Sequence, residues 1–211
     1  MSQKTIIYIT RHGQTEWNVL HKMQGHQDSP LTSLGIIQAE WLRDAMSGEK
    51  IDVIYSSSSP RAVKTAEIIK ANRGLAIIEA ENLREMNLGE WEGQIQAELK
   101  TRYPEQFHNF WNDPEHFSVP GSETYQEVLT RSTHILHDIL AKHEGKTIMI
   151  VTHTVVVKLL MSYFEGRPLK EIWNPPYIYP TCLCKIEYED QRPAIVLHGD
   201  ISHYKEKPIE S

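Results

Sequence analysis

The feature that most constrains the fold is a buried-strand pattern that ends in an arginine and a histidine. Residues 5–9 (TIIYI) are an apolar, β-branched run, which is typical of a strand buried on both faces. Arg11 and His12 follow where such a strand should end, and Gly13 allows a sharp turn. Ligands of open α/β sheets bind at the carboxyl ends of the strands. The run therefore predicts a buried parallel strand with polar chemistry at its carboxyl end.

Two further predicted strands end in the same kind of chemistry. Residues 51–55 are followed by four serines, a proline and Arg61. Because proline is well tolerated at the first helical position, a helix from residue 60 to about residue 72 is expected, with Arg61 in its first turn. Residues 147–152 form another apolar run, which His153 follows directly before an apolar helix over residues 154–164.

The remaining segments predict a layered α/β domain. Thr32 and Ser122 are expected to cap two further helices. In the first of these helices the residues expected to face the sheet are Leu34, Ile37, Trp41 and Ala45. The pattern over 94–120 predicts two short helices broken by a proline, and 181–197 a closing hairpin. We expect one three-layer domain over residues 1–211, with a mostly parallel central sheet, helices on both faces, a helical cap excursion at 94–120 and a C-terminal hairpin.

Charge and cysteine content limit the possible partners. A formal net charge of -6 over 211 residues gives no electrostatic footprint for nucleic acid or an anionic membrane. No signal-peptide pattern opens the sequence and no apolar run approaches a membrane span. Cys182 and Cys184 are two apart in one predicted strand, which is poor geometry for a disulfide, so a reduced, cytoplasmic setting is expected. The oligomeric state cannot be read from the sequence.

The three strand ends should meet at one place. Right-handed strand–helix–strand units bring all parallel strand ends to one edge of the sheet. Arg11 and His12, Arg61 and His153 would then converge from distant parts of the sequence. Two guanidiniums and two imidazoles suit a dianion, and phosphate fits best because arginine donors match phosphate oxygens in pairs. Imidazole can also attack phosphorus and form a phosphohistidine.

These segments carry a family resemblance. The motifs are Arg11-His12-Gly13 with Trp17-Asn18, Ser59-Pro60-Arg61-Ala62 with Thr65-Ala66, Leu83-Arg84-Glu85 with Gly89 and Trp91-Glu92-Gly93, and Thr152-His153. Together they span almost the whole chain and resemble, block by block, the histidine phosphatase (phosphoglycerate-mutase-like) superfamily. The broad-specificity phosphatase branch is the most similar.

The resemblance implies a role for each matching position. His12 corresponds to the nucleophile and Glu85 to the general acid. Arg11, Arg61 and His153 correspond to the phosphate pocket, and a second set lines it: Asn18, Gln24 and Gly25. The family usually has glycine after its second histidine, whereas this chain has Thr154. Its backbone N–H remains available at a helix start, so Thr154 is expected to bind phosphate still, with a side chain that narrows the pocket.

The function implied is a metal-independent phosphomonoesterase that hydrolyses small-molecule phosphate esters through a phosphohistidine on His12, without a cofactor. Two alternatives stay open: a phosphoglycerate mutase, and a non-catalytic phosphate-binding module. Glu85 runs directly into residues 86–89, without the arginine- and tyrosine-bearing segment usual in mutases, which favours hydrolysis. A metal site is not expected, because His134 and His137 share a helix face but no carboxylate or cysteine pattern completes a ligand set.

The sequence leaves the surroundings of the phosphate pocket open. One aromatic set either forms a wall over the pocket or only packs two short helices together: Trp91, Phe107, Phe110, Trp111 and Phe117. Tyr177 and Tyr179, among three prolines, form a second candidate rim. The tail from Lys205 onward is expected to be solvated. The physiological substrate is not identified.

Overall fold

A six-stranded sheet forms the centre of the protein. The computed structural model describes residues 4–190 and 192–206. The strands are β1 (Thr5–Arg11), β2 (Val53–Ser57), β3 (Ile77–Ala80), β4 (Thr147–Thr152), β5 (Leu183–Glu189) and β6 (Arg192–Asp200). Their order is β3-β2-β4-β1-β5-β6. The first four strands pair in parallel, and the hairpin β5–β6 adds two antiparallel strands beside β1. The expected mostly parallel sheet with a closing hairpin is confirmed.

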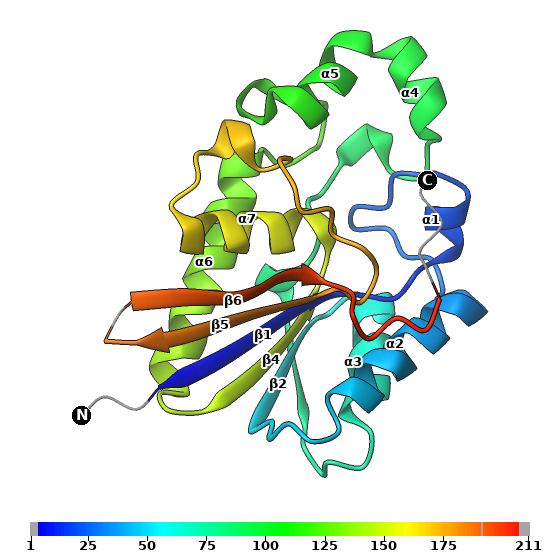
Figure 1. Ribbon diagram of the computed structural model, residues 1–211. Coiled ribbons are helices and arrows are strands. Elements are labelled where there is room, and N and C mark those ends of the chain that lie inside the picture. Colours follow the sequence, from blue (N-terminus) through cyan, green and yellow to red (C-terminus); the bar gives the residue numbers. More distant parts are fainter. Residues whose placement is uncertain (1–3, 191, 207–211) are drawn as a thin grey trace.

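Helices cover both faces of the sheet (Figure 1). The α-helices are α1 (Glu16–Val19), α2 (Ser33–Ala45), α3 (Pro60–Lys70), α4 (Gln96–Arg102), α5 (Pro104–Asn112), α6 (Tyr125–Lys142) and α7 (Thr154–Glu165). Four 3-10 turns are η1 (Glu81–Leu83), η2 (Gly89–Trp91), η3 (Pro114–His116) and η4 (Leu169–Glu171). Because strand side chains alternate between faces, Ile7 and Ile9 pack in the core under α6 and α7, while Tyr8 packs in the core under α2 and α3.

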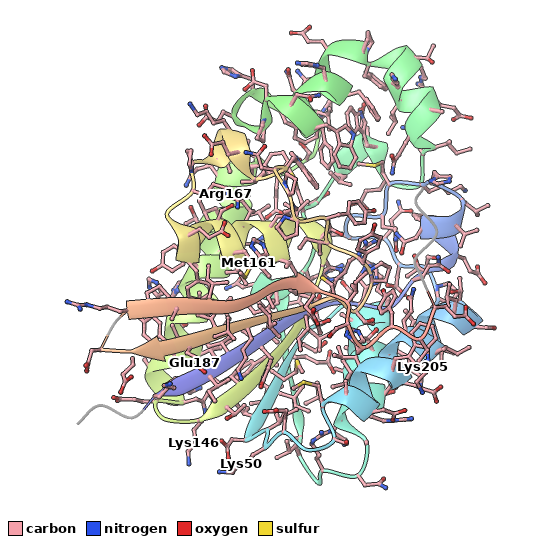
Figure 2. The ribbon with its side chains drawn as sticks, in the orientation of Figure 1. Lys50, Lys146, Met161, Arg167, Glu187 and Lys205 are labelled. Atoms are coloured by element: carbon pink, nitrogen blue, oxygen red, sulfur yellow. The ribbon has the colours of Figure 1, made fainter. Side chains whose placement is uncertain are left out.

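Strand register aligns the carboxyl ends of the parallel strands. Arg11 is paired with Thr152, the residue before His153, and Ser56 is paired with Val151. The backbone N–H of His12 extends this ladder by donating to the Thr152 carbonyl at 2.9 Å. Figure 2 shows Lys50 and Lys146 at the opposite end of the sheet, ahead of β2 and β4. The polar residues predicted from three separate segments therefore lie at one edge.

Residues 94–120 leave the sheet and return, as expected. Helices α4 and α5 form a separate group beyond the carboxyl edge of the sheet (Figure 1). This group is held by packing, since Trp91 is fully buried and its ring lies 6.1 Å from those of Tyr103 and Phe110. The group forms part of the same α/β domain.

Two details of the helices differ from expectation. In α2, Trp41 is buried as expected, but Ile37 is 41% exposed and Ala45 is also exposed, while the remaining buried positions include Gly35, Ala39 and Leu42. The core stripe is therefore partly displaced from the expected one. Helix α6 is capped by Thr124 rather than Ser122, because Thr124 makes a reciprocal capping box with Glu127.

The C-terminal hairpin carries two free, buried cysteines. Cys182 and Cys184 lie in and just before β5, and neither forms a disulfide. Within residues 4–190 and 192–206, no helix is long and apolar enough to cross a membrane.

Candidate active site

A cavity of about 590 Å³ lies at the carboxyl edge of the sheet. Eight of the residues predicted from the sequence line it: Arg11, His12, Asn18, Gln24, Gly25, Arg61, Glu85 and Thr154. His153 is not among the lining residues; it is fully buried behind His12, with the two ring centroids 5.1 Å apart. The predicted set is therefore brought together, with His153 one layer deeper than the others.

His12 is held as a neutral imidazole whose outer nitrogen, Nε2, carries no hydrogen. Its Nδ1 lies 2.7 Å from the carbonyl oxygen of Gly13, which can only accept, so Nδ1 carries the hydrogen and Nε2 carries a lone pair. Burial and the nearby Arg61 and Arg11 guanidiniums lower the pKa of His12 well below its usual range. An unprotonated Nε2 is the form of imidazole that can act as a nucleophile.

Close packing against α2 leaves no room for a side chain at Gly13. A Cβ atom at Gly13 would lie 2.3 Å from the carbonyl oxygen of Gly35 in α2. The Gly13 N–H donates to Thr65 Oγ1 in α3 at 3.1 Å. The loop that carries His12 is thus seated directly on two helices, which fixes the direction of the imidazole.

Arg61 is the most heavily bonded side chain of the site. It lies in the first turn of α3, is 2% exposed, and donates from Nη1 to the Gln27 carbonyl and to Asp28 at 2.8 and 2.9 Å. Its Nη2 donates to the Gly25 carbonyl at 2.8 Å, and its Nε points to His12 Nε2 at 3.3 Å. These bonds hold a positive charge beside the reactive nitrogen.

Arg11 supplies a second guanidinium with donors to spare. Its Nη1 donates to the Ile178 carbonyl at 3.0 Å. Its Nε is buried and, across residues 4–190 and 192–206, has no hydrogen-bond partner. A buried donor without a partner is costly, so an oxyanion in the cavity would satisfy it.

His153 lies at the start of α7 and is oriented by a serine of the four-serine run. Its Nε2 lies 2.7 Å from Ser57 Oγ, while its Nδ1 is buried and without a partner among the described residues. Burial and Arg61 lower the pKa of His153 well below its usual range, so the ring is neutral. When Ser57 donates to Nε2, Nδ1 carries the hydrogen and is free to donate to an anion. A neutral His153 could therefore offer an anion a hydrogen bond but no positive charge.

Glu85 enters the cavity from the segment after η1. Its carboxyl oxygens accept from the backbone N–H groups of Met86 at 2.9 Å and Val155 at 3.3 Å. Burial raises the pKa of Glu85, against these two bonds and the Arg61 and Arg11 charges. Arg131 on α6 fixes the segment by donating to the Glu85 carbonyl at 2.9 Å. A carboxyl group with a raised pKa therefore shares the cavity with a neutral imidazole.

The loop after α1 closes one side of the cavity through Gly25. Gly25 has φ +57°, and a Cβ there would lie 2.1 Å from Glu92 Oε1. That Glu92 carboxylate accepts from the N–H of His26 at 2.7 Å, so it holds the loop rather than facing a substrate. Gln24 Oε1 is buried without a partner in the described part of the chain, whereas the Asn18 side-chain oxygen is used to cap α1.

No cluster of three or more His, Cys, Asp or Glu side chains that could hold a metal occurs among the described residues. The groups that could bind an anion include the guanidiniums of Arg11 and Arg61, the Nδ1–H of His153 and the N-terminus of α7.

The family model for the histidine phosphatase superfamily (branch 1) matches residues 7–201. The chain belongs to the histidine phosphatase superfamily. It is similar in structure to Bacillus stearothermophilus YhfR, with 41% identity, a TM-score of 0.92, and coverage of 94% of this chain and 98% of that chain. A putative phosphoserine phosphatase 2 from Hydrogenobacter thermophilus is 30% identical over 200 residues, 95% of this chain and 98% of the relative. An Arabidopsis thaliana phosphoglycerate mutase-like protein 4 is 33% identical over 203 residues, 95% of this chain and 87% of the relative.

In this histidine phosphatase, aromatic side chains form much of the cavity beyond the phosphate-binding end. Of the five aromatic residues for which the sequence left two interpretations, Phe110 and Trp111 line the cavity, whereas Trp91 and Phe117 are buried in the core and Phe107 packs against it. Both interpretations thus hold, each for part of the set. Tyr177 and Tyr179, the second candidate rim, also line the cavity, with their ring centroids 4.5 Å apart.

Sequence reasoning missed several residues of this histidine phosphatase that shape the site. Ser57 lies within a run of four serines, and only the pairing of β2 with β4 shows which of them meets His153. Trp173, Tyr204 and Glu206 line the cavity from the C-terminal part of the chain. Lys205 and Glu206 are both exposed, as expected for a solvated tail, although Glu206 also lines the cavity and Lys205 lies beside α2, 3.9 Å from Asp44 (Figure 2). Residues 207–211 lie outside the described part.

Proposed function

We propose that this protein is a metal-independent phosphomonoesterase that hydrolyses small-molecule phosphate esters through a phosphohistidine on His12. The observation that carries the proposal is the state of His12: Nδ1 bonded to the Gly13 carbonyl, Nε2 unprotonated, and a guanidinium at 3.3 Å. This arrangement presents a nucleophile and a positive charge at one point, where a phosphoryl group would react. The phosphatase names of similar proteins support the same activity.

The first step transfers the phosphoryl group to the protein. His12 Nε2 attacks phosphorus in line, the bond from phosphorus to the ester oxygen breaks, and Glu85 gives its proton to the departing oxygen. Arg11, Arg61 and His153 bind the phosphoryl oxygens, whose charge is spread in the transition state. The raised pKa of Glu85 keeps the proton available for this transfer.

The second step returns the protein to its starting state. A water molecule attacks the phosphohistidine, Glu85, now a carboxylate, takes a proton from that water, and the bond from phosphorus to Nε2 breaks. Inorganic phosphate leaves and His12 is again neutral. The same residue therefore acts first as acid and then as base.

Hydrolysis is favoured over a mutase reaction by the charges around the cavity. A mutase must hold a phosphoglycerate, which carries a carboxylate besides its phosphate. Among the described residues that line the cavity, Lys22 is the one lysine or arginine besides Arg11 and Arg61. Its ammonium group lies over the Trp17 ring, 5.4 Å from the centroid. Glu206 adds a negative charge to the same wall. The cavity is therefore poorly suited to a second anionic group.

The decisive experiment is to trap the phosphoprotein. Wild-type protein mixed with a ³²P-labelled phosphomonoester and quenched within one turnover should carry a label that is stable in base and labile in acid. His12→Ala should carry none and release no phosphate, while His116→Ala, a matched change at an exposed surface histidine, should behave as wild type. Label on His153 would contradict the assignment of the two histidines. Label without phosphate release, together with isomerised product, would point to a mutase.

A further inference from the structure

A buried lysine outside the phosphate-binding end has no role in the mechanism above. Lys158 lies in the second turn of α7 and is 4% exposed. Its Nζ donates to the carbonyl oxygens of Asn174 and Pro176, both at 2.7 Å. Burying an ammonium group is unfavourable unless it is well bonded, so these two hydrogen bonds are what allows Lys158 to be buried here. The two carbonyls belong to one segment, residues 173–180.

That segment forms a wall of the cavity. Trp173, Tyr177, Tyr179 and Pro180 all line it. We call residues 173–180 the wall segment. It has no regular secondary structure, so its shape depends on the groups that bind its backbone. Besides Lys158, these include Arg11, whose Nη1 donates to the Ile178 carbonyl at 3.0 Å, and Tyr204, whose hydroxyl donates to the Pro180 carbonyl.

Each of these anchors holds a different part of the wall segment. Lys158 holds the part before Tyr177, where Arg167 Nη1 also reaches the Asn174 and Pro175 carbonyls at the longer distance of 3.5 Å. Arg11 and Tyr204 hold the part after it. The Trp173 indole N–H donates to the Phe110 carbonyl at 2.7 Å and so ties the start of the segment to α5. Tyr177 is itself 58% exposed, so its own burial does little to fix it. The position of Tyr177 over the cavity therefore depends mainly on Lys158, which makes the two short hydrogen bonds to this part of the segment, whereas those of Arg167 are at the 3.5 Å limit.

The nearby carboxylate of Glu165 is paired with other groups, so Lys158 binds the carbonyls of the wall segment instead. Glu165, at the end of α7, lies 2.8 Å from Arg167 and 2.9 Å from His198 on β6, so its carboxylate is already paired. Arg167 lies just after α7 (Figure 2) and repels the ammonium group. On β5 and just before it, the thiols of Cys182 and Cys184 face the same region. Burial, with Arg167 next, lowers the pKa of Lys158 to about 8.

We propose that Lys158 is a positioning residue that fixes the wall segment against the leaving group of the substrate and so sets how well large leaving groups bind. The inference rests on the proposed phosphatase function, because it assigns the wall segment to the part of the ester that departs. Arg11 contacts the same segment from the phosphate-binding end, and it keeps a backbone bond to Thr181 whatever occupies position 158. Loss of Lys158 should therefore affect the leaving-group side more than the phosphate side.

The test compares Lys158→Met, Lys158→Arg and a control, Lys64→Met, which removes an exposed lysine from α3. Methionine has a similar length and is apolar, so it suits a buried site but cannot bind the two carbonyls. With Lys158→Met we expect KM for nitrophenyl phosphate to rise about tenfold and inhibition by vanadate to change by less than about threefold. Lys64→Met should match the wild type in both.

The pH dependence of KM separates the proposed role of Lys158 from a general loss of stability. Below pH 8 the ammonium group of Lys158 is charged and binds both carbonyls strongly; as pH rises through about 8 it loses that charge. Wild-type KM for nitrophenyl phosphate should therefore rise between pH 7 and 9, where the phosphate group of the substrate stays dianionic. Lys158→Arg, which stays charged, should not show this rise.

The outcomes separate the two proposals. If the wild type hydrolyses no phosphomonoester, the proposed function fails. If it does, but Lys158→Met keeps wild-type KM or loses vanadate and substrate affinity equally, the role assigned to Lys158 is wrong. If Lys158→Met does not fold, as judged by thermal melting, the wild-type and Lys158→Arg profiles decide: the same rise in both overturns the inference.

Discussion

Replacing Glu85 by glutamine tests whether this residue is the general acid, because the loss should be large only for leaving groups that need a proton. The change keeps the shape of the side chain and removes the transferable proton. General acid catalysis contributes about a hundred- to ten-thousand-fold to a step that needs it. The alkoxide of a sugar or glycerol is a poor leaving group without a proton, whereas nitrophenolate departs readily. Formation of the phosphohistidine should therefore fall at least about a hundredfold with alkyl phosphates.

The structure sets the size of the loss expected with nitrophenyl phosphate. The Glu85 carboxyl accepts from the Met86 N–H at 2.9 Å and from the Val155 N–H at 3.3 Å. A glutamine can keep its oxygen at the shorter contact, but its NH2 group then faces the Val155 N–H, and one hydrogen bond is lost. Such a loss costs about 1 kcal/mol, which is a factor of about five. We expect a decrease of about that size for the aryl ester, independent of proton donation.

Rapid-quench measurements of the first turnover should be used, because in the proposed mechanism Glu85 also activates water in the second step, and steady-state rates would mix the two roles. Glu90→Gln, an exposed change on the same segment, is the matched control and should leave both substrates unaffected. Equal losses for alkyl and aryl esters in the first turnover would refute the assignment of Glu85 as the acid. Glu92 is not an alternative donor, since its carboxylate is occupied by the backbone N–H groups of residues 26 and 27.

Three further predictions follow from the site. With alkyl phosphates the rate of phosphohistidine formation should fall as pH rises through the raised pKa of Glu85. The rate should not fall as pH is lowered through 6.5, because the pKa of His12 lies well below that value. A loss of rate centred near pH 6.5 would contradict the neutral imidazole. Prolonged dialysis against a chelator should leave activity unchanged, and activity lost and then restored by a divalent ion would show that Arg11 and Arg61 are not the groups that neutralise the phosphate. Ser57→Ala should weaken vanadate inhibition about tenfold by freeing the His153 tautomer, whereas Ser58→Ala, its neighbour, should not; equal inhibition constants for the two variants would remove Ser57 from the site.

The strand ends could be predicted because burial imposes a pattern that is local in sequence. A strand covered on both faces must be apolar throughout, so the polar residues that follow it mark its end, as Arg11 and His12 do after β1 and His153 does after β4. Glu85 follows a short 3-10 turn rather than a strand, and no periodic pattern marks it. Its place was predicted only from the resemblance of its motif to the family.

The details that the sequence did not predict depend on contacts between distant segments. Ile37 matches the helical period of α2, yet it is exposed, because Gly35 rather than a larger residue faces the loop after β1. Thr124 and Ser122 are equally good caps in isolation, and the position of Glu127 decides between them. The wall segment lies far from His12 in the sequence and reaches the cavity through the bonds of Lys158 and Arg11, which no local pattern reveals.

If His12 is the nucleophile, as proposed above, the contact between Arg61 Nε and His12 Nε2 makes phosphoryl transfer an exchange of partners at Nε2. In the free protein the guanidinium occupies the lone pair of the nucleophile, so this lone pair is shielded from other acids and electrophiles. When phosphorus takes that lone pair, Arg61 Nε is released beside the new phosphoryl oxygens, while Asp28 and two backbone carbonyls hold the rest of the guanidinium still. The same donor is thus a competitor of the substrate before the reaction and a ligand of the product after it. A weak electrophile cannot displace Arg61 Nε from the His12 lone pair. A phosphoryl group can, because it supplies an oxygen that accepts a hydrogen bond from the same Nε.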